Sequence, residues 1–203
     1  MSYTIVVARY NENVDFLDGL DNVVIYNKGN PLQQKNSIER PNVGRESESY
    51  LYHIINNYSD LPDYLVFMQG RPFDHMSDID ANNFSTEILT LINKKVDSIR
   101  PLFTNLLTER HYMYPGIKTR EYYSYLIDST QVPDTMQFAA GCQYIIPKSS
   151  ILKRDVEFYK KIHNMLLKNT IQNVGLACYG YNEFNPDTID PWCLERLFRY
   201  LFI

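Results

Sequence analysis

The sequence predicts an α/β domain in which helices flank a central, mostly parallel sheet. Short apolar segments rich in β-branched residues alternate with segments of helical periodicity, which is the order found in right-handed βαβ units. Three of the apolar segments pass directly into polar loops, as buried parallel strands do at their carboxyl ends. The 203 residues show no internal repeat or low-complexity linker, and a chain of this length can bury one sizeable core. A single domain is therefore expected.

Strands and helices alternate in the first half of the chain. Strands are predicted over 4–8, 22–26 and 64–68, and the last of these is the most apolar. We expect one helix to begin near Val14 and a second to cover 47–58. Polar composition and Pro41 predict that residues 33–44 form a loop over the strand ends.

The second half is predicted less evenly. Helices are expected over 84–95, 149–167 and 191–202, and Pro191 suits the first turn of the last one. A loop feeding a strand is expected over 137–147, whereas the Tyr-rich residues 103–128 have no clear periodicity.

Composition excludes several classes of function. The net charge of −4 and the absence of a dense Lys/Arg run argue against a nucleic-acid partner. Cys142, Cys178 and Cys193 are odd in number and lack a C-x-x-C spacing, so reduced thiols are expected. No segment approaches the ~20 apolar residues of a membrane span, and the N-terminus has no signal-peptide pattern, so we expect a cytoplasmic protein without a transmembrane segment.

Four polar loops follow predicted strands and are expected to open on one edge of the sheet. They cover 9–13, 42–46, 69–75 with its continuation 77–80, and 139–143. Arginines in the first three suit a diphosphate, and Tyr10 suits stacking on a base. For each loop a plainer interpretation stays open: a polar turn at 9–13, a surface ion pair between Arg45 and Glu48, and tight strand packing at 139–143.

Asp78 and Asp80 form an acidic pair separated by one residue. With His75 nearby, such a pair can hold Mg²⁺ or Mn²⁺, which would bridge the phosphates of a nucleotide donor. The alternative is an acidic helix N-terminus without a metal.

Seven segments together resemble a known family: Val7-Ala8-Arg9-Tyr10-Asn11-Glu12, Tyr26-Asn27-Lys28-Gly29, Asn42-Val43-Gly44-Arg45-Glu46-Ser47, Tyr50-Leu51-Tyr52-His53-Ile54-Ile55, Val66-Phe67-Met68-Gln69-Gly70-Arg71-Pro72-Phe73-Asp74-His75, residues 139–147, and Glu195-Arg196-Leu197-Phe198. They are similar to a GT-A-type glycosyltransferase-like family of fungi and large algal viruses. The resemblance implies a GT-A-like, Rossmann-related, three-layer fold with about six strands. It also implies one domain over 1–203, with a nucleotide-binding half at about 1–80 and an acceptor-side half at about 81–203.

The resemblance implies a hexosyltransferase. Its donor would be a nucleoside diphosphate sugar such as UDP-glucose, and its acceptor a hydroxyl of a glycan or glycoprotein, for example a viral capsid glycoprotein in the host cytoplasm. The expected donor-binding residues are Ala8, Arg9, Tyr10, Asn11, Glu12, Asn42, Gly44, Arg45, Gln69, Gly70, Arg71, Gly141 and Gln143. The expected catalytic candidates are Asp74, His75, Asp155, Asp190 and Glu195, with Asp187 as a further possible base, and Asp78 and Asp80 would bind Mn²⁺ or Mg²⁺.

One departure from the family pattern concerns the metal. GT-A enzymes usually carry Asp-x-Asp directly at the end of the central strand, where this chain has Gln69-Gly70-Arg71. Either the following loop folds back to deliver Asp78 and Asp80, which is the interpretation we favour, or Arg9 and Arg71 neutralise the diphosphate.

Two other functions stay open. The chain would be a non-catalytic carbohydrate- or nucleotide-binding module if the tyrosines between Tyr112 and Tyr125 stack on sugars. It would be a metal-dependent phosphoesterase if Asp74, His75, Asp78 and Asp80 form a metal site, although two-metal sites need more ligands.

Overall fold

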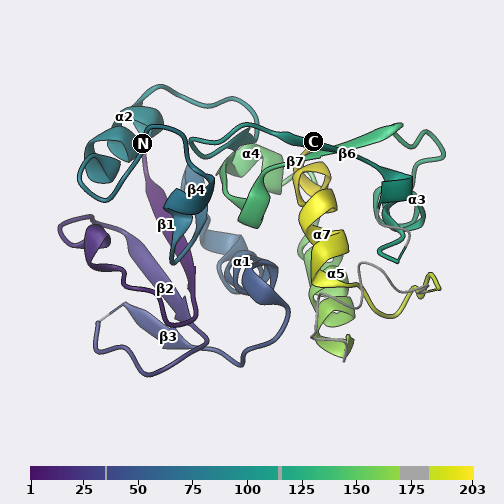
Figure 1. The fold of residues 1–203 in the computed structure, drawn as a ribbon, viewed down its shortest axis with the longest axis horizontal. Helices are drawn as coiled ribbons and strands as arrows, with labels where there is room; N and C mark the ends of the chain where they lie inside the picture. Colours follow the sequence, from purple (N-terminus) through teal and green to yellow (C-terminus); the bar gives the residue numbers. More distant parts are fainter. Residues whose placement is uncertain (35, 114–115, 170–182) are drawn as a thin grey trace.

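A computed structural model describes residues 1–34, 36–113, 116–169 and 183–203 (Figure 1). The strands are β1 (Tyr3–Arg9), β2 (Val23–Asn27), β3 (Ser37–Glu39), β4 (Tyr64–Gln69), β5 (Arg100–Pro101), β6 (Leu107–Arg110), β7 (Thr135–Phe138) and β8 (Tyr144–Pro147). The α-helices are α1 (Arg45–Asn56), α2 (Phe84–Asn93), α3 (Thr119–Ile127), α4 (Lys148–Ile151), α5 (Val156–Lys168) and α7 (Pro191–Leu197).

Six strands form the central sheet in the order β3-β2-β1-β4-β8-β5. β1 pairs in parallel with both β2 and β4, so that Val6 lies opposite Val24 on one side and Phe67 on the other. β3 extends the parallel part beyond β2, whereas β8 runs antiparallel to β4 and β5. The predicted α/β class with a mostly parallel sheet of about six strands is confirmed. β6 and β7 form a separate antiparallel pair that extends toward α3 (Figure 1).

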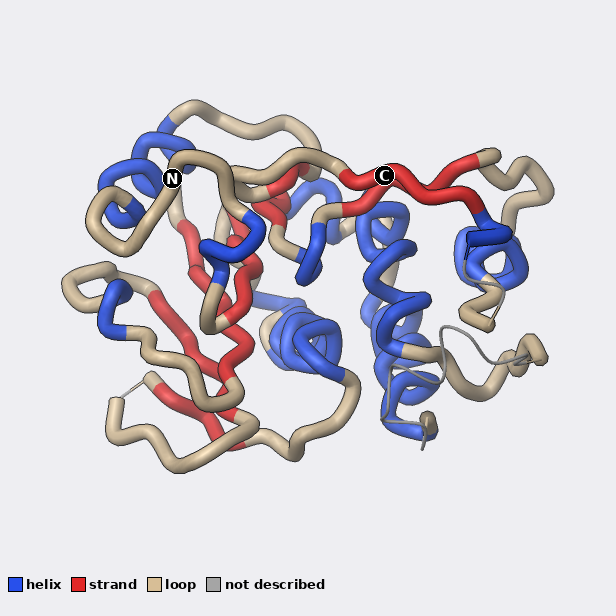
Figure 2. Tube along the Cα trace, viewed as in Figure 1, coloured by secondary structure: helices blue, strands red, loops and turns tan. Residues whose placement is uncertain are grey.

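Helices cover both faces of the sheet, which gives three layers. Alternate residues of a strand point to opposite faces, and β1 sends Ile5 and Val7 into one core and Val6 and Ala8 into the other. The first core is closed by the apolar face of α2, and the second by α1, α5 and α7. In Figure 2, α1 lies between the strands and the column formed by α5 and α7, and α1 packs directly on α5.

Several predicted elements need correction. The helix expected from Val14 is a single 3-10 turn, η1 (Asp15–Leu17), because Gly19 turns the chain with a φ of 82°. The predicted loop 33–44 contains β3, which hydrogen-bonds to the edge of β2. The helix predicted over 149–167 is two helices, since the Asp155 side chain accepts a hydrogen bond from the Phe158 amide and starts α5 afresh.

The Tyr-rich stretch and the chain end also take definite forms. α3 and β6 lie within 103–128, where no periodicity was apparent. The predicted C-terminal helix is α7, which continues as a 3-10 helix, η6 (Phe198–Phe202).

Cys142 and Cys193 are buried thiols without a disulfide, while Cys178 and Tyr114 lie outside the described residues. In the described part of the chain, no helix has the length and apolarity needed to cross a membrane.

Candidate functional site

A cavity of about 300 Å³ opens at the carboxyl ends of β1 and β4. β1 is the strand from which the order reverses, with β2 on one side and β4 on the other, and open α/β sheets bind ligands at such a point. Its lining comes from the loops after β1, β2 and β4 and from the start of α1: Ala8, Arg9, Tyr10, Glu12, Lys28, Asn42, Arg45, Glu46, Gln69, Arg71 and Asp74. A second hollow of about 390 Å³, lined by Tyr10, Asn11, Glu12, Asn13 and Arg71, shares three of these residues and adjoins the cavity.

Two glycines allow the three loops to approach one another. A Cβ at Gly29 would lie 1.6 Å from the carbonyl oxygen of Tyr10, so the loop after β2 touches the loop after β1 through bare backbone. A Cβ at Gly70 would lie 2.8 Å from a carboxylate oxygen of Glu12. Gly70 therefore shapes the wall of the cavity without lining it.

Arg9 holds these loops together. Its Nε donates to the carbonyl oxygen of Glu12 at 2.8 Å, and its Nη1 donates to Asn27 Oδ1 at 2.6 Å and to the carbonyl oxygen of Asn30 at 3.1 Å. The residue is 9% exposed. Most of the hydrogen-bonding capacity of this predicted phosphate-binding residue is thus used within the protein.

Lys28 lines the cavity, but its ammonium group is bound by other groups of the protein. Its Nζ donates to the carbonyl oxygens of Val43 at 2.7 Å and Arg45 at 2.5 Å, and it forms an ion pair with Glu48 Oε2 at 2.8 Å. Burial lowers the pKa of Lys28 against the opposing pull of Glu48. Lys28 anchors the segment that leads into α1, and it was not among the residues predicted from the sequence.

Glu48 is the centre of a buried charge cluster. Besides Lys28 it contacts Arg40, and one of its oxygens lies 3.2 Å from His163 Nε2 on α5. Burial acts to raise the pKa of Glu48, but the hydrogen bond from His163 and the partners Lys28 and Arg40 outweigh it and lower the pKa to about 2. The alternative interpretation of this loop, a surface ion pair between Arg45 and Glu48, does not hold, because Glu48 is buried with Lys28, Arg40 and His163.

The N-terminus of α1 opens on the cavity. Gly44 precedes the helix with a φ of 63°, and no side chain caps the first turn. A Cβ at Gly44 would lie 2.8 Å from the Leu166 side chain, so the glycine permits α1 to pack on α5 and does not line the cavity. The first-turn amides of a helix carry a partial positive charge that favours an anion.

Arg45 and Arg71 are the cavity arginines with substantial exposure. The Arg45 side chain is 38% exposed, and its φ of 51° is a strained value for a residue other than glycine. The Arg71 side chain is 72% exposed, and its Nε lies 3.1 Å from Asp74 Oδ1. Both guanidinium groups are therefore positioned to exchange weak internal contacts for a bound anion.

Glu46 and Glu195 form an acidic pair beneath this part of the cavity. Glu46 lines the cavity, and Glu195 on α7 accepts a hydrogen bond of 2.6 Å from the Gly141 amide. Burial and the charge of Glu46 raise the pKa of Glu195 to about 7, against the effects of the Gly141 hydrogen bond and of Arg196 and Arg45.

The predicted loop 139–143 supports the cavity from behind. Gly141 has a φ of 67°, and a Cβ there would lie 2.5 Å from the Gln69 side chain. Gln143 is fully buried, accepts a hydrogen bond from the Gln69 amide at 3.3 Å and donates to the carbonyl oxygen of Pro72 at 3.2 Å. Neither residue lines the cavity, so both position Gln69 and the loop after β4.

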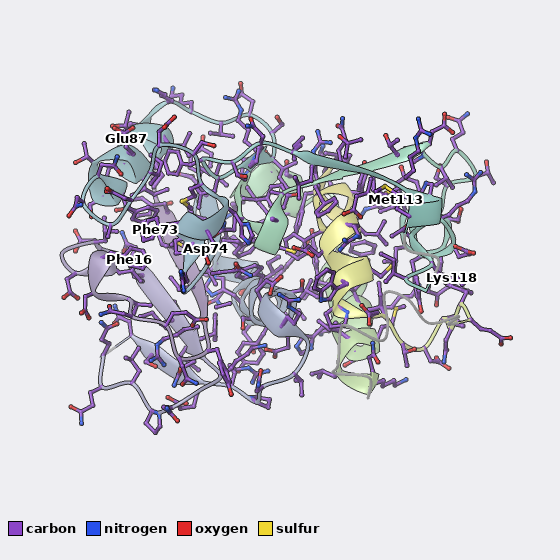
Figure 3. All side chains as sticks on the ribbon, in the orientation of Figure 1. Phe16, Phe73, Asp74, Glu87, Met113 and Lys118 are labelled. Carbon is purple, nitrogen blue, oxygen red and sulfur yellow. The ribbon has the colours of Figure 1, made fainter. Side chains whose placement is uncertain are left out.

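Among the other catalytic candidates, Asp74 lines the cavity and His75 does not. Figure 3 shows Asp74 beside Phe73 and near Phe16, far from Met113 and Lys118, and the Phe16 and Phe73 rings meet edge to face at 4.9 Å. Asp155 and Asp190 cap α5 and α7 by accepting hydrogen bonds from the amides of Phe158 and Trp192. Asp187 is exposed in a turn near the chain end. These three aspartates do not line the cavity.

The predicted metal ligands are not brought to the cavity. The Asp80 carboxylate accepts hydrogen bonds from the amides of Asn82 at 2.8 Å and Asn83 at 3.2 Å, just before α2. These bonds lower the pKa of Asp80. Asp78 precedes the same turn with a φ of 59°. Over the described ranges, no group of three or more His, Cys, Asp or Glu side chains is arranged to hold a metal ion.

Eight of the predicted donor-binding residues therefore line the main cavity, and Asn11 lines the adjoining hollow. Lys28 and Glu46 were missed as lining residues. Lys28 follows a predicted strand, and Glu46 lies in the predicted loop with Gly44 and Arg45. Their positions, at a strand end and at a helix start, could have identified them as lining residues.

Comparison with known proteins gives one match. The model of a family described as a protein of unknown function (DUF3431) matches residues 5–114. This region contains every residue that lines the cavity, whereas Glu195 lies outside it. Searches of curated proteins and of solved structures gave no match.

Proposed function

The chain belongs to the DUF3431 family, whose function is unknown, and from its site we propose that it is a glycosyltransferase using a nucleoside diphosphate sugar as donor. One observation carries the proposal. Two exposed arginines, Arg45 and Arg71, and the uncapped N-terminus of α1 converge on a cavity at the point where the strand order reverses. Arginine forks and first-turn helix amides are the groups that bind phosphates best.

The dimensions of the cavity and hollow suit such a donor. Small-molecule sites commonly measure roughly 300–1,000 Å³, and the cavity of about 300 Å³ adjoins a hollow of about 390 Å³. Tyr10 is 51% exposed and lines both, which suits stacking on a base such as uracil. In this proposal the diphosphate lies at Arg45 and Arg71, and the hexose lies over Glu46.

The proposal includes a GT-A-like, Rossmann-related fold. The three layers and the six-stranded, mostly parallel sheet support it. The cavity residues all fall within the expected nucleotide-binding half, at about 1–80, and Glu195 approaches from the expected acceptor-side half. The acceptor would be a hydroxyl of a glycan or glycoprotein.

The expected Mn²⁺ or Mg²⁺ does not fit Asp78 and Asp80. Asp80 uses its carboxylate to stabilise the turn before α2, and neither residue lines the cavity. The charge of the diphosphate is assigned here to Arg45, Arg71 and α1, and no step is routed through a metal. A phosphoesterase built on Asp74, His75, Asp78 and Asp80 is disfavoured on the same grounds, since Asp74 alone of these lines the cavity.

Calorimetry with UDP, with and without Mn²⁺, tests the donor site. We expect UDP to bind in both conditions, and the absence of binding heat in both would contradict the proposal. A panel of UDP-sugars assayed for hydrolysis then separates an enzyme from a binding module, because a module binds the donor without releasing UDP.

A further inference from the structure

Glu46 on α1 and Glu195 on α7 interact electrostatically, and their two helices pack on each other behind the cavity wall. The Glu46 side chain is 7% exposed and lines the cavity, whereas the Glu195 side chain is 12% exposed and lies behind it. Glu195 is fixed by the Gly141 amide at 2.6 Å and by Arg196 Nη1 at 3.3 Å. The described residues give Glu46 an ion pair with Arg45 at 3.5 Å but no hydrogen bond. Of the two residues, Glu46 is thus the one whose carboxylate oxygens can accept a hydrogen bond from a ligand in the cavity.

The surroundings leave Glu195 as the group that titrates near neutral pH. The charged and titratable side chains that face the pair are Lys28, Arg45, Tyr50, Cys142, Tyr144 and Arg196. Burial raises the pKa of Tyr50, Cys142 and Tyr144, so these three stay neutral. Because the pKa of Glu195 is about 7, this carboxyl group is protonated in about half of the molecules at pH 7 and in most of them at pH 6.

A second observation points to a ligand at this pair. The Tyr50 hydroxyl is fully buried and, among the described residues, has no hydrogen-bond partner. The charges of Glu46 and Glu195 act on this hydroxyl group, and together with burial they raise its pKa. A buried hydroxyl group without a hydrogen-bond partner is unfavourable, and such a group is commonly retained where a ligand or a catalytic role uses it.

Resting on the proposed transferase function, we propose that Glu46 is the catalytic base for the attacking hydroxyl and that Glu195 is a positioning residue that acts on it from α7. The acceptor oxygen forms a bond to the anomeric carbon, and its proton passes to a carboxylate oxygen of Glu46. The bond between the anomeric carbon and the phosphate oxygen breaks, and its electron pair leaves with the nucleoside diphosphate. Attack on the face opposite the leaving group inverts the anomeric configuration.

Glu46 suits this role better than the other carboxylates of the cavity. A carboxylate oxygen of Glu12 accepts a hydrogen bond from the Tyr10 amide at 2.6 Å, and Asp74 is exposed and paired with Arg71. A neutral Glu195 keeps a second negative charge away from the anionic donor.

The test uses Glu46→Gln, Glu195→Gln and, as a matched control, Glu157→Gln on the exposed face of α5, with UDP and UDP-glucose as probes. We expect Glu46→Gln to bind UDP within about threefold of wild type but to hydrolyse UDP-glucose on the order of 100-fold more slowly or worse. Glu46→Asp restores part of the rate, and Glu157→Gln leaves it unchanged. Thermal unfolding verifies that each variant is folded.

Glu195 is tested by two readouts that a structural role would not change. Infrared spectra of the wild type are expected to show the band of a protonated carboxyl group at pH 6 that fades by pH 8 and is missing in Glu195→Gln. The pH profile of hydrolysis is expected to lose its step near 7 in the same variant. Absence of the infrared difference would overturn the assignment of Glu195 as the carboxyl group that titrates near pH 7.

The outcomes separate this inference from the transferase itself. Wild-type turnover of a UDP-sugar together with full turnover in Glu46→Gln would overturn the base while leaving the transferase intact. Absence of UDP binding in the wild type would overturn the donor site, and UDP binding without turnover of any UDP-sugar would overturn both the transferase and the base.

Discussion

The guanidinium carbon of Arg45 lies 5.1 Å from the ring centroid of Trp192, and Arg196 lies over the same indole ring at 5.2 Å. Arg196 is fixed in turn by Glu109 through bonds of 2.7 and 3.0 Å. Contacts between guanidinium groups and indole rings are favourable, so Trp192 holds Arg45 at the edge of the cavity. Trp192 is also the one tryptophan of the chain, and its fluorescence therefore reports on Arg45.

We predict that UDP changes the fluorescence of Trp192 in a saturable way. Arg45→Met should remove most of this change and weaken UDP binding roughly tenfold or more, because it removes a charge-assisted contact to phosphate. Fluorescence titration measures both effects. Arg120→Met, an exposed arginine on α3, is the control and should bind UDP as the wild type does. Equal UDP affinity in Arg45→Met would remove Arg45 from the phosphate site.

We predict that Gly29→Ala damages the site and the fold together. The added methyl group would lie 1.6 Å from the Tyr10 carbonyl oxygen and 2.4 Å from Asn11 Oδ1, so the loop after β1 has to move. Overpacking of this kind costs roughly 1–3 kcal/mol, and UDP affinity should fall as well. Urea unfolding and UDP calorimetry measure the two effects.

Gly19→Ala provides the comparison. Gly19 has a φ of 82° but no atom within 4 Å of an added Cβ, so the substitution strains the backbone by about 1 kcal/mol without touching the site. It should lower stability and leave UDP affinity unchanged. A Gly29→Ala variant that binds UDP normally would show that the loop contact does not matter.

We predict that Glu48 makes the protein sensitive to acid. Its pKa is about 2 in the folded protein, against 4.5 when unperturbed, so its stabilisation is complete above pH 4.5 and is lost as the pH falls toward 2. The loss amounts to about 3 kcal/mol. Urea unfolding from pH 6 to pH 2 measures this loss.

Glu48→Gln should abolish most of this acid dependence. At pH 6 it should also destabilise the protein by roughly 3–5 kcal/mol, because Lys28 and Arg40 lose their buried partner. Glu157→Gln, which alters an exposed pair with Lys160, should have little effect on stability or on its pH dependence. If the unfolding free energy of Glu48→Gln still decreases at acid pH as it does in the wild type, the effect belongs to other carboxylates.

Glu195 should produce the opposite dependence. Its pKa rises from 4.5 to about 7 on folding, so the folded protein retains a proton that the unfolded chain has already lost. The unfolding free energy should therefore fall as the pH rises from about 4.5 to 7 and then level off. Glu195→Gln should remove this dependence between pH 4.5 and 7. The unfolding free energy of the variant, relative to that of the wild type, should therefore be higher at pH 8 than at pH 5. Parallel curves for the two proteins in urea unfolding would contradict the shift.

We predict that Asp80 acts on the fold and not on the donor. Asp80→Ala removes the acceptor for the Asn82 and Asn83 amides, so the midpoint of thermal unfolding should fall. UDP affinity, measured with and without Mn²⁺, should stay at the wild-type value. A loss of affinity confined to the Mn²⁺ condition would restore the metal-binding role suggested by the Asp78-x-Asp80 pattern.

Some features of the site could be predicted because they are local. The apolar segment ending at Ala8 and the one ending at Met68 became the neighbouring strands β1 and β4, and the polar residues that follow them line the cavity. Gly44 and Arg45 were expected at a helix start and lie there. A strand and the loop after it consist of consecutive residues, so hydrophobic periodicity and turn residues identify them.

Other features were hidden because they depend on partners distant in sequence. Arg9, Lys28, Arg45 and Arg71 look alike as cations after strands or at a helix start, yet Arg9 and Lys28 are bound by Asn27, Glu48 and backbone carbonyls. Asp155, Asp190 and Asp80 look like acids of a site and act as helix caps or turn residues.

The sequence by itself determined the α/β class, the strands that lead to the cavity and the loops that surround it, because alternation of apolar and polar residues acts within a few residues of chain. Only the tertiary structure decided which cations remain exposed to a ligand and that Glu46 interacts electrostatically with Glu195, which lies near the far end of the chain. The physical reason is that hydrogen bonds, burial and charge are shared among neighbours in space, and the folding of α7 against α1 brings those neighbours together.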